Sequence, residues 1–395
     1  MTALPIHGQG VFVFNAPSDH PCVFQILNDA RTDGLRIEFT TTNVRVSEVV
    51  SLKPLLDPAN KAGLSARAGA YYWFSIDSQN QQLYAGVGEA RLETAIYSYT
   101  FPSSTKDLFE STKRFLESLT TVCHESSIAP LRVIKDPITQ SIPLLVKGMD
   151  DLTMEHIASA SHMPLANLPP MCQKLYNCIA GKNFCLETAD FPDFAQAIEY
   201  SIRTPGLWCN KKLQEKSREF NPEKPDLYET YLRITLGRNN GESPGIPYVM
   251  EIWPVGHYSP IHSHANATAM IRVLSGEINV SLYPFLCAEK DGVGPFGNAT
   301  FHKDDITWIT PTLNQTHQLR NMPTNSTACI TIQCYMYPNN DRRHYDYFDY
   351  VDSSGQQQPY EPDSDMDFLD FKQVIKSEWL ARGPAVVGAS RWWCC

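Results

Sequence analysis

Short runs that alternate apolar and polar residues dominate the first hundred residues of the chain. Residues 11–14, 35–39 and 44–50 show this pattern, with turn-forming residues between them. Side chains of a strand point to its two faces in turn, so a period of two predicts β-strands. The polar run at 77–80 separates two further apolar runs, which is typical of a hairpin turn. We expect a jelly-roll-like β-sandwich over residues 1–135.

Near residue 103 the period changes to that of a helix. One amphipathic stripe consists of Leu108, Phe109, Thr112, Phe115, Leu116 and Leu119. Ser103 to Thr105 precede this stripe and supply candidate N-cap residues. Residues 150–215 show further helical stripes, interrupted by prolines. We therefore expect a helical connector over residues 136–220 that packs on the domain following it.

Strand-like alternation returns after Pro225. Six runs of this kind lie at 231–237, 248–254, 269–285, 305–311, 317–321 and 328–338. Many short strands with Gly and Asn turns between them predict a small β-barrel or jelly roll, which we place over residues 221–345. Residues 346–395 read as an acidic, solvated surface tail with a short helix. The predicted fold class is mainly β, with an N-terminal sandwich, a helical middle segment and a C-terminal barrel.

Charge and composition exclude several classes of partner. The 395 residues include 33 Lys and Arg against 43 Asp and Glu, which gives a formal net charge of −10 at pH 7. A nucleic-acid-binding surface needs a basic face for the phosphates, so we expect no nucleic-acid partner. No apolar run reaches the roughly 18 residues of a membrane span, and the N-terminus lacks a signal-peptide pattern. Together with eleven scattered cysteines, these features predict a cytoplasmic protein without a membrane partner.

A histidine pattern supplies the candidate chemistry. His262 and His264 are two positions apart in a strand-rich region, so both side chains point to the same face. His317 follows a later strand-like run. Imidazole binds iron, copper, zinc or nickel, and three neutral imidazoles leave the metal its full charge and open coordination positions. A chance His-x-His on a strand is the alternative, but the third histidine favours a metal site.

Residues 225–340 resemble the cysteine dioxygenase branch of the cupin superfamily, the small thiol dioxygenases. The resemblance rests on the pattern Trp-x-x-Gly-His-x-Ser-x-Ile-His-x-His-x-Asn at 253–266, on His317-Gln-Leu-Arg-Asn321, on Tyr231-Leu-Arg233 and on Tyr335. It implies a cupin β-barrel in which His262, His264 and His317 are the ligands of Fe(II).

The resemblance also assigns residues around the metal. It implies that Arg233 binds the substrate carboxylate and that Tyr335 is the active-site tyrosine, so both are expected to be catalytic. Ala269 stands where animal members carry a cysteine that cross-links to this tyrosine, so no thioether is expected. Thr331 and Gln333 replace a Ser and a His of the family, and we expect both to contact substrate. Glutamine can orient a tyrosine hydroxyl but cannot take up a proton near neutral pH.

Three functions remain open at this point. The first is an Fe(II)-dependent dioxygenase that adds O2 to the sulfur of a small thiol such as cysteine or 3-mercaptopropionate, giving a sulfinate. The second is a cupin lyase or isomerase that uses the metal as a Lewis acid. The third is a non-catalytic metal-binding cupin whose N-terminal domain binds an unknown ligand. Arg233 and Tyr335 favour the first, although an internal carboxylate is an alternative partner for Arg233.

Two further features, one in the N-terminal domain and one at the C-terminus, carry weaker signals. The aromatic run at 71–75 resembles jelly-roll modules, some of which bind carbohydrate, but we interpret it as a sandwich core. Cys394 and Cys395 end the sequence in the manner of prenylated small GTPases. Because no GTPase domain accompanies them, we expect no lipid there.

Overall fold

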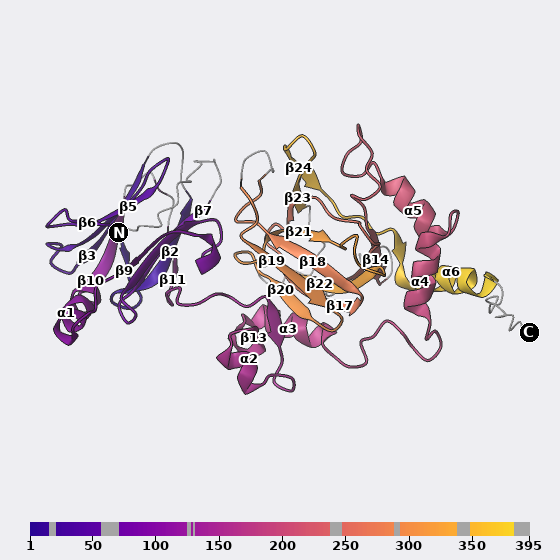
Figure 1. Cartoon of the computed structure of the whole chain (residues 1–395), viewed down its shortest axis with the longest axis horizontal. Helices are drawn as coiled ribbons and strands as arrows, with labels where there is room; N and C mark the ends of the chain where they lie inside the picture. The colour runs from indigo at the N-terminus through magenta and orange to yellow at the C-terminus, as the bar shows by residue number, and fades with distance from the viewer. Residues whose placement is uncertain are drawn as a thin grey trace, which may run out of the picture.

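The computed structural model describes residues 1–15, 21–56, 71–124, 128, 131–237, 247–287, 293–337 and 348–382, so Cys394 and Cys395 lie outside the described residues. Two β-rich parts lie next to each other, the N-terminal one in indigo and purple and the C-terminal one mainly in orange (Figure 1). The fold is mainly β, as the alternation along the chain predicts. None of the described helices is long and apolar enough to cross a membrane.

The N-terminal part is a sandwich of two antiparallel sheets. Its strands are β1 (Thr2–Ala3), β2 (Gln9–Asn15), β3 (Cys22–Asn28), β4 (Gly34–Phe39), β5 (Val44–Glu48), β6 (Pro54–Leu55), β7 (Tyr71–Asp77), β8 (Gln82–Val87), β9 (Ala95–Thr100), β10 (Leu119–His124) and β11 (Arg132–Ile134). One sheet has the order β1-β10-β3-β4-β5-β6 and the other the order β11-β2-β7-β8-β9. The sandwich expected from the sequence is confirmed.

Burial along these strands follows the predicted alternation. In β4, for example, Leu35, Ile37 and Phe39 are buried while the charged residues between them are partly exposed. Phe12 and Phe74 come from neighbouring strands, are completely buried and stack with ring centroids 4.9 Å apart. The aromatic run that contains Phe74 is therefore mainly sandwich core, as expected.

The C-terminal part is a double sheet. Its eight-stranded sheet contains β12 (Leu145–Lys147), β13 (His162–Pro164), β14 (Leu232–Leu236), β15 (Tyr248–Trp253), β17 (Thr268–Ser275), β20 (Ile306–Ile309), β22 (Cys329–Met336) and β25 (Met366–Asp367). Its six-stranded sheet contains β16 (His262–Ser263), β18 (Glu277–Leu282), β19 (Gly297–His302), β21 (Thr316–Arg320), β23 (Phe348–Val351) and β24 (Gln357–Tyr360). The strand orders are β13-β12-β20-β17-β22-β15-β14-β25 and β19-β18-β21-β16-β23-β24. No pairing joins these two sheets within the described residues, so the expected barrel is an open double sheet.

Helices cover the eight-stranded sheet. They are α2 (Met154–Ala158), α3 (Pro170–Ile179), α4 (Phe194–Arg203), α5 (Trp208–Lys216) and α6 (Phe368–Ala381), whereas α1 (Lys106–Glu117) belongs to the sandwich. Two short 3-10 helices are η1 (Leu92–Thr94) and η2 (Leu165–Asn167). Buried residues of α3, α4 and α5 share one hydrophobic core with strands of the sheet. The segment expected to be a helical connector, 136–220, also contributes two short strands, β12 and β13, to this sheet.

The acidic tail is integrated into the fold, which corrects the expectation of a solvated segment. Strand β23 pairs with β16, and β25 pairs in parallel with β14. Helix α6 packs on α4, with Phe371 and Ile375 completely buried. The acidic composition concealed these buried residues in the sequence, because the aromatic and aliphatic side chains are interspersed among the carboxylates.

Candidate metal centre

The structure brings the three predicted metal ligands together. His262 in β16 lies directly opposite His317 in the antiparallel neighbour β21. His264 follows β16 on the same stretch of chain. One nitrogen of each ring lies within 4.8 Å of the other two. The predicted convergence of these side chains is therefore present in the structure.

Backbone carbonyls fix the orientation of two rings. The Nδ1 of His262 lies 3.0 Å from the carbonyl oxygen of Pro260, and the Nδ1 of His317 lies 3.1 Å from that of Asn314. A carbonyl oxygen only accepts, so each Nδ1 carries the proton and donates. The Nε2 lone pair of each ring is then available for a metal, which is the usual arrangement of metal-binding histidines.

Burial keeps the three imidazoles neutral. It is the largest cause that lowers the pKa of His262 to about 4 and the pKa of His317 to about 3. Burial also lowers the pKa of His264 well below its ordinary value, and the neighbouring His317 adds to this effect. All three rings are therefore neutral imidazoles at neutral pH, the form that binds metals.

The donor set fits a divalent transition metal. The Nε2 atoms of His264 and His317 lie only 3.1 Å apart, so a cation between them would be shared by both rings. The cluster contains no carboxylate, and imidazole suits iron, copper, zinc and nickel better than it suits magnesium or calcium. Three ligands are fewer than such a metal accepts, which leaves positions for other molecules.

Arg233 has an internal carboxylate partner. Its Nη1 lies 2.9 Å from Oε1 of Glu251, and the two residues are 1% and 4% exposed. They are direct partners across β14 and β15, so their side chains share one face of the sheet. The alternative that the sequence left open for Arg233 is thus realised, and the guanidinium charge is balanced within the protein.

The same carboxylate connects Arg233 to the predicted tyrosine. Gln333 donates its side-chain N–H to Glu251 and accepts a hydrogen bond from the hydroxyl of Tyr335. Burial is the largest cause that raises the pKa of Tyr335, and Glu251 adds to it. The ring of Tyr335 stacks near that of His264, with centroids 6.1 Å apart. Gln333 therefore orients a protonated tyrosine beside the histidine cluster.

Ala269 lies next to this tyrosine. It is the direct partner of Tyr335 across β17 and β22. The adjacent residue Cys334 packs in the opposite core, where its thiol contacts the carbonyl oxygen of Leu175. The position that faces Tyr335 thus offers a methyl group and no sulfur, as the sequence predicts.

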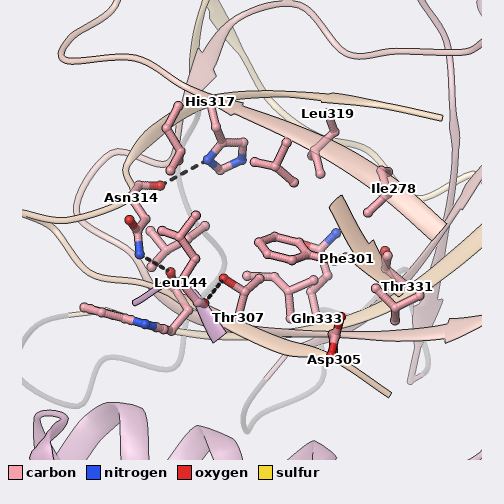
Figure 2. Close-up of a pocket in the computed structure, with 16 residues that line it drawn as sticks. Leu144, Ile278, Phe301, Asp305, Thr307, Asn314, His317, Leu319, Thr331 and Gln333 are labelled. Carbon is pink, nitrogen blue, oxygen red and sulfur yellow. Dashed lines mark hydrogen bonds between the residues drawn. The ribbon is translucent and has the colours of Figure 1, made fainter. Parts of the chain in front are cut away.

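An apolar cavity lies between the sheets and reaches His317 (Figure 2). Thr331 and Gln333, the two predicted substrate contacts, are part of its wall, whereas Arg233 and Tyr335 are not. The rest of the wall is mainly aliphatic and aromatic and includes Ile271, Val273, Ile278, Val280, Leu282, Phe301 and Leu319. The buried hydroxyl of Thr331 makes no hydrogen bond among the described residues. One of the three candidate metal ligands, His317, therefore forms part of the wall of an apolar cavity.

Two groups near the histidines were not predicted. Glu251 pairs with Arg233, and alternation places each residue on a strand but does not show that the two lie opposite each other. Phe348 packs edge-on against His264, with ring centroids 4.3 Å apart, and comes from the tail that looked solvated. The sequence gives no signal for this contact.

Comparison with known proteins adds little to this site. No family model and no curated protein matched the chain. An oxalate oxidase in complex with the substrate analogue glycolate is 18% identical over 31% of this chain and 56% of its own, with a TM-score of 0.22. A cupin 2 domain-containing protein from Halorhodospira halophila is 18% identical over 42% of this chain and 90% of its own, with a TM-score of 0.21. These values assign neither reaction nor substrate to the chain.

Proposed function

We propose that this chain is an Fe(II)-dependent dioxygenase that adds both atoms of O2 to the sulfur of a small thiol and so forms a sulfinate. The observation that carries the proposal is the cluster of three neutral histidine nitrogens beside a buried, oriented tyrosine. Bound iron would supply a redox-active Lewis acid that takes the thiol as thiolate at neutral pH. A purely structural metal site would need no tyrosine at this place.

The residues of the chain have separate roles in this proposal. His262, His264 and His317 hold the metal, and two carbonyl oxygens keep their rings in place. Tyr335 stays protonated because burial raises its pKa, so its hydroxyl is a hydrogen-bond donor. Gln333 orients Tyr335 but cannot take up its proton. The balanced reaction is RSH + O2 → RSO2H, which consumes no external reductant.

The partner of Arg233 bears on the substrate class. A guanidinium that is already neutralised by Glu251 offers no net charge for a substrate carboxylate. The cavity wall at His317 contains no lysine or arginine among the described residues. We therefore propose that a carboxylate is not required for recognition, and that Arg233 acts as a positioning residue through Glu251 and Gln333.

An oxygen electrode tests the reaction. The iron-loaded protein is mixed with cysteine, 3-mercaptopropionate or cysteamine, and the product is identified by mass spectrometry. We expect O2 uptake that matches sulfinate formation, with cysteamine at least as fast as the two carboxylated thiols. His317→Ala is the inactive control. No O2 uptake with any thiol, despite bound iron, would contradict the dioxygenase and favour Lewis-acid chemistry.

A substitution at Arg233 separates the two roles of this residue. If it positions Gln333 and Tyr335, Arg233→Met lowers the turnover of cysteine and of cysteamine by the same factor. If it binds the substrate carboxylate, the loss is confined to the carboxylated thiols. Removal of a buried arginine that pairs with a substrate carboxylate typically costs about 2–5 kcal/mol, or roughly 1.5 to 3.5 decades in rate. A selective loss of that size with cysteine would restore the carboxylate role.

A further inference from the structure

We propose that the N-terminal sandwich positions the metal ligands of the C-terminal part, with Arg91 and Glu89 as positioning residues. The inference rests on the three-histidine site described above and gives the sandwich a role in it. The segment concerned follows β8 and ends in η1. It contacts the loop between β20 and β21, which carries Asn314 and Gln315 just before His317.

Arg91 connects three parts of the chain. Its side chain is 2% exposed. Nη1 donates to Oδ1 of Asn314 at 2.9 Å, and Nη2 donates to the carbonyl oxygen of Ile142 at 3.0 Å. Nε donates to Glu93 of its own segment at 2.8 Å. A buried guanidinium is tolerable only with its donors satisfied, so these bonds hold Asn314 firmly to the sandwich.

Asn314 in turn orients His317, one of the three candidate metal ligands. Its backbone oxygen accepts the Nδ1–H of His317 at 3.1 Å, the contact that sets the ring orientation (Figure 2). Asn314 adopts a left-handed backbone with φ of 59°, which is disfavoured unless contacts hold it there. Its side chain meets this need by accepting from Arg91 and donating to the carbonyl oxygen of Trp308 at 3.0 Å.

Glu89 reaches a second ligand through Gln315. Its Oε1 accepts the backbone N–H of Gln315 at 2.8 Å, and Glu89 is 8% exposed. The Oε1 of Gln315 accepts the backbone N–H of His264 at 3.0 Å. The side-chain amide of Gln315 donates to the carbonyl oxygens of Ala267 and Thr310, at 3.0 and 2.8 Å. The sandwich is thus two hydrogen bonds away from His264 and two from His317.

Metal affinity distinguishes a residue that positions the metal ligands from one that only holds the two parts of the chain together. A residue that only joins the two parts affects stability and leaves the affinity of the folded site unchanged. A residue that holds ligand geometry weakens metal binding, and loss of an outer partner of a metal-bound histidine typically costs about 10–100-fold in affinity. The metal affinity of the folded protein is therefore the deciding quantity.

The experiment titrates the metal-free full-length chain with Co2+ and follows binding by visible absorption. Arg91→Ala and Glu89→Ala are each expected to weaken Co2+ binding by about 10-fold, the lower end of this range, because each acts through Asn314 or Gln315. Glu89→Gln keeps an oxygen that accepts from Gln315, so it should restore most of the affinity lost in Glu89→Ala. Arg36→Ala is the control, because Arg36 pairs with Glu38 on the sandwich and, among the residues that the structure describes, forms no ion pair with the C-terminal part.

The outcomes are distinct. Wild-type affinity in folded Arg91→Ala and Glu89→Ala would overturn the inference and leave the metal site intact. If Arg91→Ala does not fold, the Glu89→Ala and Glu89→Gln pair decides, since equal affinities in those two variants also overturn it. A wild-type chain that binds no Co2+ would overturn both the metal site and the inference. Thiol oxidation is not part of this readout, so a failed oxidation assay leaves it unaffected.

Discussion

Aromatic and aliphatic side chains fill the space between the sheets of the N-terminal sandwich, and its buried Glu89 and Arg91 lie in the segment that contacts the C-terminal part. The C-terminal double sheet instead buries charged and polar groups on its own strands. Phe12, Phe24 and Phe74 represent the first interior. Arg233 and Glu251 represent the second, together with the histidine cluster. Apolar burial stabilises a fold at no electrostatic cost, but buried charges lose hydration and need partners. The contrast places the candidate metal centre in the C-terminal part, which agrees with the supporting role that we propose for the sandwich.

The largest effect should come from breaking the buried ion pair. Glu251→Ala removes the carboxylate that pairs with Arg233, which is only 1% exposed, and breaking such a pair typically costs about 3–5 kcal/mol of unfolding free energy. The double variant Arg233→Leu/Glu251→Leu removes both charges and should be more stable than Glu251→Ala. Urea unfolding of the C-terminal part measures these differences. A double variant less stable than the single one would show that the pair is not the main source of the cost.

A smaller and pH-dependent effect should come from Glu229. Burial first, then the negative charges of Asp226 and Asp352, raise its pKa from 4.5 to about 7. Between these pH values the unfolded chain has lost a proton that the folded chain still holds, so stability falls as pH rises. The glutamine of Glu229→Gln does not ionise, so the stability of this variant should not fall with pH for this reason.

The melting temperature across pH measures the effect. We expect Glu229→Gln and the wild type to differ least below pH 4.5, the variant to gain progressively up to about pH 7, and the difference to level off above that pH. Glu223→Gln, at an exposed position of the same segment, is the control. A difference that does not change with pH would refute the assignment to this carboxyl group.

The smallest effect is an expected absence of change. Because Ala269 faces Tyr335, the wild-type chain should run as a single band on denaturing gels, with or without iron and thiol. Intact-protein and peptide mass spectrometry check the same point. Detection of Tyr335 joined to any cysteine, Cys334 included, would contradict it.

The sequence predicted the parts of this molecule that depend on local period and short motifs. Alternation identified the sandwich, and the motif containing His262 and His264 pointed to the metal site with His317. The Arg233–Glu251 pair depends on strand register, which the pattern of each strand alone does not determine. The bond from Arg91 to Asn314 joins residues 223 positions apart, so no local pattern reveals it. Acidic residues likewise concealed the buried anchors of the tail, such as Phe371.

Metal content is the most direct test of the three-histidine centre. The purified wild-type chain and His317→Ala are compared by inductively coupled plasma mass spectrometry after reconstitution with Fe(II) under anaerobic conditions. We expect about one iron per wild-type chain and almost none in His317→Ala, because two imidazoles hold a divalent ion far less tightly than three. Full iron occupancy in folded His317→Ala would contradict the account.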